Sequence, residues 1–217
     1  MPTDVAVARV SRSAGVSPSS KRRFAKGLTT LATVFKKAGY RTAGVTTNPL
    51  VHSKFGYSQG FELYDDFTVM LTADLNLCGD AMVGPGAGGP HNVELGRGGV
   101  TSPMVNRFAE TFLNKHKNEE RPFFLFLLYF DPHADYVPPP PYNTMFGKYV
   151  DPSIGVGVYP RRPTHPYAPD EKKQLISLYD GEIRNTDEHI GKLLATLDRL
   201  KIADNTIVIA LADHGEE

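Results

Sequence analysis

Residues 27–49 read GLTTLATVFKKAGYRTAGVTTNP, and this stretch decides the fold class. Four apolar residues have the i, i+3, i+4, i+7 spacing of an amphipathic helix: Leu31, Val34, Phe35 and Ala38. Thr29 or Thr30 can cap the start of this helix, and Gly39 can end it with a positive φ. A short strand is predicted at 42–45, directly after the helix. A helix that leads so closely into a strand is typical of an α/β fold.

The rest of the chain repeats this alternation of helix and strand. Residues 103–117 and 170–200 have the apolar periodicity of helices. Residues 123–130, FFLFLLYF, form a continuous apolar run typical of a strand buried on both faces of a parallel sheet. Another buried strand is predicted at residues 206–211. We therefore expect an α/β layered sandwich, with a mostly parallel sheet flanked by helices.

Three segments fall outside this pattern within a single predicted domain, residues 1–217. Residues 1–26 are Ser-rich and basic, and their pattern assigns them to no element. Residues 79–99 are rich in glycine, which predicts an irregular segment at the surface (a surface excursion). Residues 131–170 hold ten of the chain's 17 prolines, which predicts a long loop.

The composition is that of an ordinary globular protein. Hydrophobic residues make up 41% of the chain, and 24 basic residues balance 24 acidic ones, so no electrostatic reason exists to expect nucleic acid or a membrane surface as partner. Cys78 is the only cysteine, which excludes an intrachain disulfide. No secretory signal or membrane span is visible, so we expect a soluble protein with the cytoplasm as the default compartment. The oligomeric state stays open.

Two predicted strands end in an aspartate and a histidine. The strand at 123–130 leads into Asp131 and His133, and the strand at 206–211 leads into Asp213 and His214. Ligands of open α/β sheets bind beyond the carboxyl ends of the strands, and carboxylate and imidazole groups suit a divalent cation. The alternatives are that the second pair caps the next element and that His133 is a solvent-facing loop residue.

Other candidates have weaker support from the sequence. Asp65 and Asp66 form a carboxylate pair, but they follow no clear strand. Asp187 is interpreted as a packing or capping acid. The remaining histidines are predicted in loops or on helix faces without a second ligand nearby: His52, His91, His116, His165 and His189.

Three long stretches together resemble the sulfatase branch of the alkaline phosphatase superfamily. They are LATVFKKAGYRTAGVTTNPLV with GYSQGFELYDDF, RPFFLFLLYFDPHADYVPPPPY, and LYDGEIRNTDEHIGKLLATLDRLKIADNTIVIALADHGEE. The resemblance covers most of residues 28–217, in the order of the family. It implies a hydrolase of sulfate esters, or of related phosphate or phosphonate esters, with bound calcium or magnesium. The implied substrate is a small-molecule or glycan sulfate ester.

The resemblance also assigns roles to individual residues. Asp213 and His214 match the family's aspartate and following Asn or His that ligate the cation after a buried strand. His133 matches the histidine that contacts the sulfate and protonates the leaving oxygen. These roles agree with the chemistry, because a cation stabilises a transferring oxyanion and an acid stabilises a leaving alkoxide.

The sequence departs from the family pattern in three places. Sulfatases begin with a strand that ends in two aspartates of the metal site, and none is visible before residue 28. Their formylglycine nucleophile arises from a C/S-x-P/A-S/T-R motif, which the LCGDA around Cys78 does not match. The family's GKWHLG is replaced by GVTTNPLV at 44–51, so a substrate-binding lysine and histidine are absent there.

Family members continue far beyond the DHG loop, so we expect residues 1–217 to be an incomplete catalytic domain, with an N-terminal and a C-terminal part missing. The activity of such a fragment is in question. Two alternatives stay open. One is a phosphodiesterase or phosphotransferase of the same superfamily, and the other is a non-catalytic remnant.

Overall fold

The computed structural model describes residues 24–48, 51–66, 101–133, 135–148, 154–155 and 167–215. The predictions for Cys78, for the Gly-rich segment 79–99 and for most of residues 1–26 lie outside these residues. The described elements follow in chain order: α1 Leu31–Lys37, β1 Arg41–Thr46, the 3-10 helix η2 Ser53–Phe55, β2 Leu63–Asp65, α5 Ser102–His116, β3 Phe123–Leu128, η3 Tyr142–Thr144, α6 Pro169–Arg199 and η4 Ala203–Asn205.

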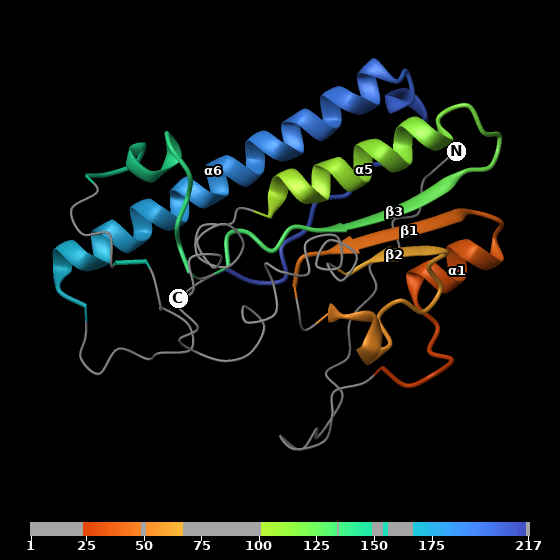
Figure 1. Ribbon diagram of the computed structural model, residues 1–217, viewed down its shortest axis with the longest axis horizontal. Coiled ribbons are helices and arrows are strands. Elements are labelled where there is room, and N and C mark those ends of the chain that lie inside the picture. The colour runs from red at the N-terminus through yellow and green to blue at the C-terminus, as the bar shows by residue number, and fades with distance from the viewer. Residues whose placement is uncertain are drawn as a thin grey trace, which may run out of the picture.

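The three strands form one parallel sheet with β1 in the middle (Figure 1). Ala43 of β1 pairs with Leu63 of β2 on one side and with Leu125 of β3 on the other. Apart from Arg41, every residue of β1 is buried, as expected for a central strand covered on both faces. The predicted α/β architecture with a parallel sheet flanked by helices is confirmed.

Alternate residues of the sheet face different layers. One face packs against α5 and α6, and its core comprises Ala43, Phe123, Leu125, Phe112, Leu113 and Leu197. The opposite face packs against α1, where the rings of Phe35 and Phe124 stack with centroids 4.5 Å apart. This alternation follows from the period of two in a strand.

Helix α1 begins and ends as its sequence predicts. The Thr30 hydroxyl accepts a hydrogen bond from the Thr33 backbone N–H (3.1 Å), and the Thr33 hydroxyl in turn accepts from the Thr30 N–H (2.8 Å). This reciprocal capping box satisfies two donors at the helix start. Gly39 follows the helix with φ of 89°, a conformation that side chains rarely tolerate.

The predicted apolar face of α1 is partly wrong. Leu31 and Val34 are exposed, whereas Ala32 is buried and Phe35 reaches the sheet. Ala32 and Phe35 are three residues apart, so they share one side of the helix. The sheet therefore covers a narrower stripe of α1 than the sequence pattern indicates.

Helices α5 and α6 confirm the two longer helical predictions to within one residue at each end. Val105, Ala109 and Phe112 form the buried side of α5. The buried side of α6 is partly polar, and its polar members are Gln174, Glu182, Asn185, Thr186 and Thr196. Among the helices that the structure describes, none is long and apolar enough to cross a membrane.

Helix α6 packs closely on the segment that contains η3. A Cβ atom added to Gly181 would lie 2.6 Å from the Tyr142 carbonyl oxygen, well inside van der Waals contact. Nearby, Tyr136 packs with Leu175 and Leu178 in a second small core. The described part of the Pro-rich loop, which follows β3 in the chain, therefore packs against α6.

Strand β3 is present, but the prediction that it is buried on both faces is wrong. None of its residues is buried, and Phe126 is 40% exposed. Within the described sheet, β3 is an edge strand, since the strand order ends with it. An edge strand has a neighbour on one side only, so its side chains are less covered than those of β1.

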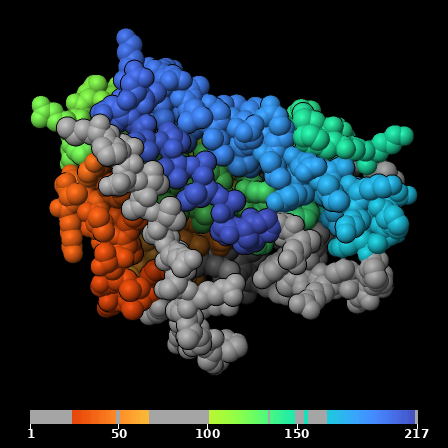
Figure 2. Space-filling model, turned by 180° about the vertical axis from the view of Figure 1, so that it is seen from behind, coloured from red at the N-terminus to blue at the C-terminus, as the bar shows by residue number. Residues whose placement is uncertain are grey.

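The predicted buried strand at 206–211 is also wrong. These residues form no strand, and four of their apolar side chains are exposed: Ile207 90%, Val208 53%, Ile209 74% and Leu211 90%. Figure 2 shows this C-terminal segment, in dark blue, on the molecular surface. A strand is buried only where a partner strand pairs with it, and the described sheet supplies none here.

Candidate functional site

Polar side chains lie where the three strands reach their carboxyl ends. Thr47 follows β1, Asp66 follows β2, and the segment after β3 leads to Asp131 and His133. Because the strands are parallel, these ends meet at one edge of the sheet. Ligands of open α/β sheets bind at this edge, which makes it the candidate site.

The Asp131 carboxylate is anchored to the first turn of α5. Its Oδ1 accepts hydrogen bonds from the Thr101 backbone N–H (3.2 Å) and hydroxyl (3.0 Å). Its Oδ2 accepts from the Ser102 backbone N–H (2.9 Å) and hydroxyl (2.6 Å). These four donors match the four lone-pair sites of a carboxylate, and a helix N-terminus favours negative charge. Asp131 therefore caps α5 and is not presented to a cation.

Thr47 connects β1 to the same corner. Its hydroxyl accepts a hydrogen bond from the Phe130 backbone N–H (3.2 Å) and donates one to the Thr101 hydroxyl (3.0 Å). The Thr101 hydroxyl then donates to Asp131. Thr47 and Thr101 are both buried. A continuous chain of hydrogen bonds thus joins the ends of β1 and β3 to the start of α5.

His133 lies directly after this corner. Its backbone N–H donates to the Phe130 carbonyl oxygen (2.9 Å), which closes a turn. Its ring stacks on the Phe130 ring, with centroids 4.4 Å apart and planes 19° apart. The structure therefore places His133 at the carboxyl edge of the sheet, as the sequence predicts, and fixes its ring from one side.

A second set of contacts ties the end of β3 to both long helices. The Tyr129 hydroxyl donates to Asn106 Oδ1 of α5 (2.6 Å), and Asn106 Nδ2 donates to the His189 carbonyl oxygen of α6 (2.7 Å). Burial raises the pKa of the Tyr129 hydroxyl well above its usual value. This hydroxyl therefore acts as a neutral donor across the physiological range.

The loop after His133 is attached to α6 through a buried carboxyl group. Glu182 Oε1 accepts a hydrogen bond from the Val137 backbone N–H (2.7 Å). Burial is the main cause that raises the pKa of Glu182 to about 8; the Val137 hydrogen bond opposes this shift, and the negative charges of Asp131 and Asp135 add to it. Near neutral pH, Glu182 therefore carries a proton much of the time.

The structure brings together one pair of residues that the sequence left apart. Asp66 directly follows β2 and is 3% exposed, and its Oδ2 lies 3.1 Å from His52 Nδ1. The Ser53 backbone N–H also donates to this oxygen (2.8 Å). A protonated Nδ1 donates to Asp66, whereas an unprotonated Nδ1 accepts from the Lys54 N–H (3.0 Å). The predictions that His52 lacks a nearby ligand and that Asp66 follows no strand are wrong.

That pair could not be recognised from sequence periodicity. β2 contains three residues, which is too short to show the alternation of a strand. The sequence offers a local signal here, the glycine at position 60. In the structure Gly60 has a φ of 93° and turns the chain into β2.

Asp213 and His214 lie on the exposed segment that follows residues 206–211. The His214 backbone N–H donates to Asp213 Oδ1 (3.0 Å), and His214 Nδ1 lies 2.7 Å from the Gly215 carbonyl oxygen. His214 Nε2 lies 3.7 Å from Asp213 Oδ2. The side chains are 65% (His214) and 89% (Asp213) exposed.

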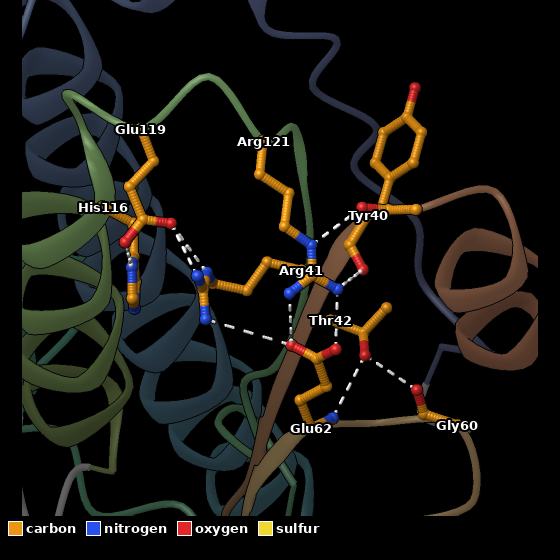
Figure 3. Close-up of polar contacts among 9 residues, drawn as sticks. Tyr40, Arg41, Thr42, Gly60, Glu62, His116, Glu119 and Arg121 are labelled. Atoms are coloured by element: carbon orange, nitrogen blue, oxygen red, sulfur yellow. Dashed lines mark hydrogen bonds and ion pairs between the residues drawn. The ribbon is translucent and has the colours of Figure 1, made fainter.

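The opposite end of the sheet carries a cluster of ion pairs, which Figure 3 shows. Arg41 at the start of β1 donates to Glu119 Oε2 through Nε (3.0 Å) and Nη2 (2.6 Å). Glu119 Oε1 lies 2.7 Å from His116 Nδ1. The prediction that His116 has no second ligand nearby is therefore also wrong. Contacts with His116 and then Arg41 lower the pKa of the Glu119 carboxyl group.

Arg121 completes this cluster from the segment before β3. Its guanidinium donates to both carboxylate oxygens of Glu62 (2.6 and 3.2 Å) and to the backbone carbonyl oxygens of Gly39 and Tyr40 (2.8 and 2.7 Å). The Arg121 contact lowers the pKa of Glu62. These contacts fasten the turn between α1 and β1 to the start of β3 (Figure 3).

Comparison with known proteins identifies the family of this chain. The sequence model of the Sulfatase family matches residues 8–217, nearly the whole chain. This chain belongs to the sulfatase family. The resemblance inferred from the three sequence stretches is thereby confirmed.

Curated relatives of this sulfatase-family chain are distant and longer. An ulvan-active sulfatase of Formosa agariphila is 25% identical over 199 residues, which cover 86% of this chain and 35% of the relative. The multifunctional alkaline phosphatase superfamily protein PehA of Trinickia caryophylli is 27% identical over 137 residues, covering 51% of this chain and 27% of PehA. The chain thus spans about a third of the curated relatives' length or less.

One solved structure is similar to this chain, with a lower sequence identity than the curated relatives have. It is a crystal structure of Ps i-CgsB in complex with k-i-k-neocarrahexaose, with a TM-score of 0.45 and 16% identity. The similarity covers 80% of this chain and 37% of that one.

The cation that the sulfatase family implies needs more ligands than the described residues bring together. Carboxylate and imidazole groups suit calcium or magnesium, so the donor types of Asp213 and His214 fit. Calcium takes six or more ligands, however. Within the described residues, no three histidine, cysteine, aspartate or glutamate side chains lie close enough to hold a metal ion. Two exposed neighbours alone do not form a complete site.

Proposed function

We propose that this chain supplies part of the catalytic domain of a sulfate ester hydrolase. The supporting observation is the position of His133: in a chain of the sulfatase family, it lies at the carboxyl edge of a parallel sheet. Its ring is held by Phe130, and its backbone closes the turn after β3. A histidine fixed at this edge is suitably placed to act on a bound ester.

In the proposed reaction His133 acts as a general acid. Hydrolysis breaks the bond between sulfur and the ester oxygen, and it yields an alcohol and inorganic sulfate. An alkoxide is a poor leaving group, so protonation of the ester oxygen by an imidazolium N–H lowers the barrier. The nucleophile is not identified among the described residues.

We further propose that Asp213 and His214 contribute ligands to a calcium or magnesium ion. Such a cation, when bound, supplies positive charge that stabilises the sulfate oxygens. The donor chemistry of both side chains supports this assignment. The remaining ligands would come from parts of the protein other than the described residues.

The proposed substrate class is a sulfated glycan. It rests on the similarity to an ulvan-active sulfatase, which aligns with 86% of this chain. A small aryl sulfate is a suitable first probe, because it reports the same bond cleavage without demanding the correct sugar.

The test compares sulfate release by the wild-type protein and by His133→Asn, with p-nitrophenyl sulfate and a sulfated polysaccharide as substrates. Loss of a general acid costs about 10²- to 10⁴-fold in rate, so His133→Asn is expected to lose at least about 100-fold. His116→Asn at the opposite end of the sheet is the matched control and retains the wild-type rate. Equal rates for both variants contradict the role of His133.

Calorimetric titration with calcium and with magnesium tests the cation ligands. Asp213→Ala is expected to weaken binding, whereas Asp187→Ala, which removes an exposed carboxylate of α6, leaves it unchanged. Identical titration curves for Asp213→Ala and the wild type would remove Asp213 from the site.

A phosphodiesterase is the second candidate, favoured by the similarity to PehA over 51% of the chain. Hydrolysis of bis(p-nitrophenyl) phosphate without any release of sulfate from aryl sulfates would select it. Turnover of neither ester class would favour the non-catalytic alternative.

A further inference from the structure

We propose that Asp131 is a positioning residue for His133. It fixes the corner between β3 and the segment carrying His133, and thereby sets where the imidazole lies. The contacts of Asp131 carry the inference about position, and only its kinetic readout rests on the proposed function.

The first support is how completely the Asp131 carboxylate is held. Four donors of Thr101 and Ser102, at 2.6 to 3.2 Å, engage both of its oxygens. Thr101 is 8% exposed and Ser102 is fully buried, so water cannot replace the carboxylate without rearrangement. Asp131 thus has little freedom to move relative to α5.

The second support is the short path from Asp131 to the imidazole. His133 is two residues further along, and its N–H bonds back to the Phe130 carbonyl oxygen. Phe130 provides the ring against which His133 stacks, and its own N–H is bound to Thr47. Phe130 and Asp131 are adjacent, so a shift of Asp131 displaces both the backbone turn and the stacking surface.

The third support comes from the flanks of this corner. Before it, Tyr129 is bound to Asn106 of α5, and after it Val137 is bound to Glu182 of α6. The segment 129–137 is therefore attached at both ends. Asp131, two residues before His133, joins the segment after β3 to the start of α5 through a charged group.

An ordinary helix cap would stabilise α5 without setting the position of His133. The two possibilities differ in a measurable way. A cap alone changes the free energy of unfolding, whereas a positioning residue also changes the ring environment of His133 in the folded protein.

The experiment uses Asp131→Asn, which keeps the size of the side chain but replaces one acceptor oxygen by a donor. The readout is the ¹H–¹³C NMR signal of the His133 ring, assigned with His133→Gln, in samples whose circular dichroism shows a folded protein. Stacking on Phe130 shifts this signal, so we expect it to move toward the position of an unstacked histidine. Asp170→Asn, at the exposed first turn of α6, is the control and leaves the signal unchanged.

The kinetic arm measures sulfate ester hydrolysis by the same proteins. We expect kcat of Asp131→Asn to fall about tenfold or more with little change in KM, because a displaced acid loses orientation. If the wild type releases no sulfate, the proposed function fails, while the NMR signal still decides whether Asp131 positions His133.

A second variant covers the case in which Asp131→Asn does not fold. The double variant Thr101→Val/Ser102→Ala removes the two hydroxyl donors and keeps both backbone donors. It is expected to move the His133 signal in the same direction. If the folded variants keep the wild-type His133 signal, Asp131 is a helix cap only and the proposal is overturned.

Discussion

The two ends of the sheet are held by different chemistry. At the amino end, Arg41 and Arg121 pair with Glu119 and Glu62 across side chains that remain 28 to 36% exposed (Figure 3). At the carboxyl end, the contacts of Asp131 involve Ser102 and Thr101, which are both buried. Exposed ion pairs contribute little to stability, whereas buried polar groups are costly to leave unpaired.

This difference also gives the two ends opposite responses to pH. Ion pairs lower the pKa of Glu62 and Glu119 at the amino end. Burial raises the pKa of Glu182, which holds the loop at the carboxyl end. Acid is therefore expected to loosen the amino end, and base the carboxyl end.

The largest expected effect belongs to Glu182→Gln at high pH. The pKa of Glu182 is raised from 4.5 to about 8, so its stabilising effect is full below pH 4.5 and is lost as pH rises through 8. The Gln side chain still accepts from Val137 but never ionises. At pH 9 we expect the variant to be more stable than the wild type by about 3 to 5 kcal/mol. Urea unfolding from pH 2 to pH 9 measures this difference.

Glu188→Gln is the control of opposite sign. Hydrogen bonds from Lys192 and Tyr142 lower the pKa of this exposed carboxyl group to about 2. Its stabilising effect is present above pH 4.5 and is lost as pH falls through 2. If both variants show the same pH dependence as the wild type, the contrast between buried and exposed carboxyl groups is wrong.

The second largest effect is expected for Asp131→Ala. The variant leaves the buried hydroxyl and N–H of Ser102 without their acceptor and removes the negative charge at the start of α5. A loss of about 3 kcal/mol in the free energy of unfolding is expected. Asp170→Ala, which removes a carboxylate with 95% exposure from the first turn of α6, should lose less than about 1 kcal/mol. Equal losses in urea unfolding would contradict the distinction.

The smallest effect is expected for Glu62→Gln at the amino end. Arg121 keeps its bonds to the Gly39 and Tyr40 carbonyl oxygens, so only the ion pair is lost. The loss should stay below about 1 kcal/mol and vanish at high salt, where exposed charges are screened. Unfolding measured at low and at 1 M salt checks this, and a loss that persists at high salt would show that the amino end is not held mainly by exposed ion pairs.

Local signals in the sequence predicted the structure correctly where backbone polar groups find their hydrogen-bond partners within a few residues along the chain. The cap at Thr30 and the stop at Gly39 use contacts within a few residues, and both are confirmed. The helix at 170–200 was predicted almost to the residue, but five polar residues on its buried side were not. Periodicity reports apolar positions, and it carries no information about polar side chains whose partners lie on other elements.

The predictions failed where burial depends on a neighbouring strand. Residues 206–211 and 123–130 have similar apolar composition, yet the first segment is exposed and the second is a half-buried edge strand. An apolar run shows that a strand is suited to burial, but only the pairing of strands shows whether it is covered. The same limit hid Asp66, because β2 is recognisable only through its pairing with β1.

The sequence by itself determined the α/β class, the central helix–strand unit, the family resemblance and the candidate residues His133, Asp213 and His214. Only the tertiary structure decided that Asp131 is bound by the start of α5 and that His133 stacks on Phe130. The reason is physical. Helix and strand preferences arise from neighbours along the chain, whereas the partners of the Asp131 carboxylate come from a segment about 30 residues away, brought together only when the sheet and α5 pack.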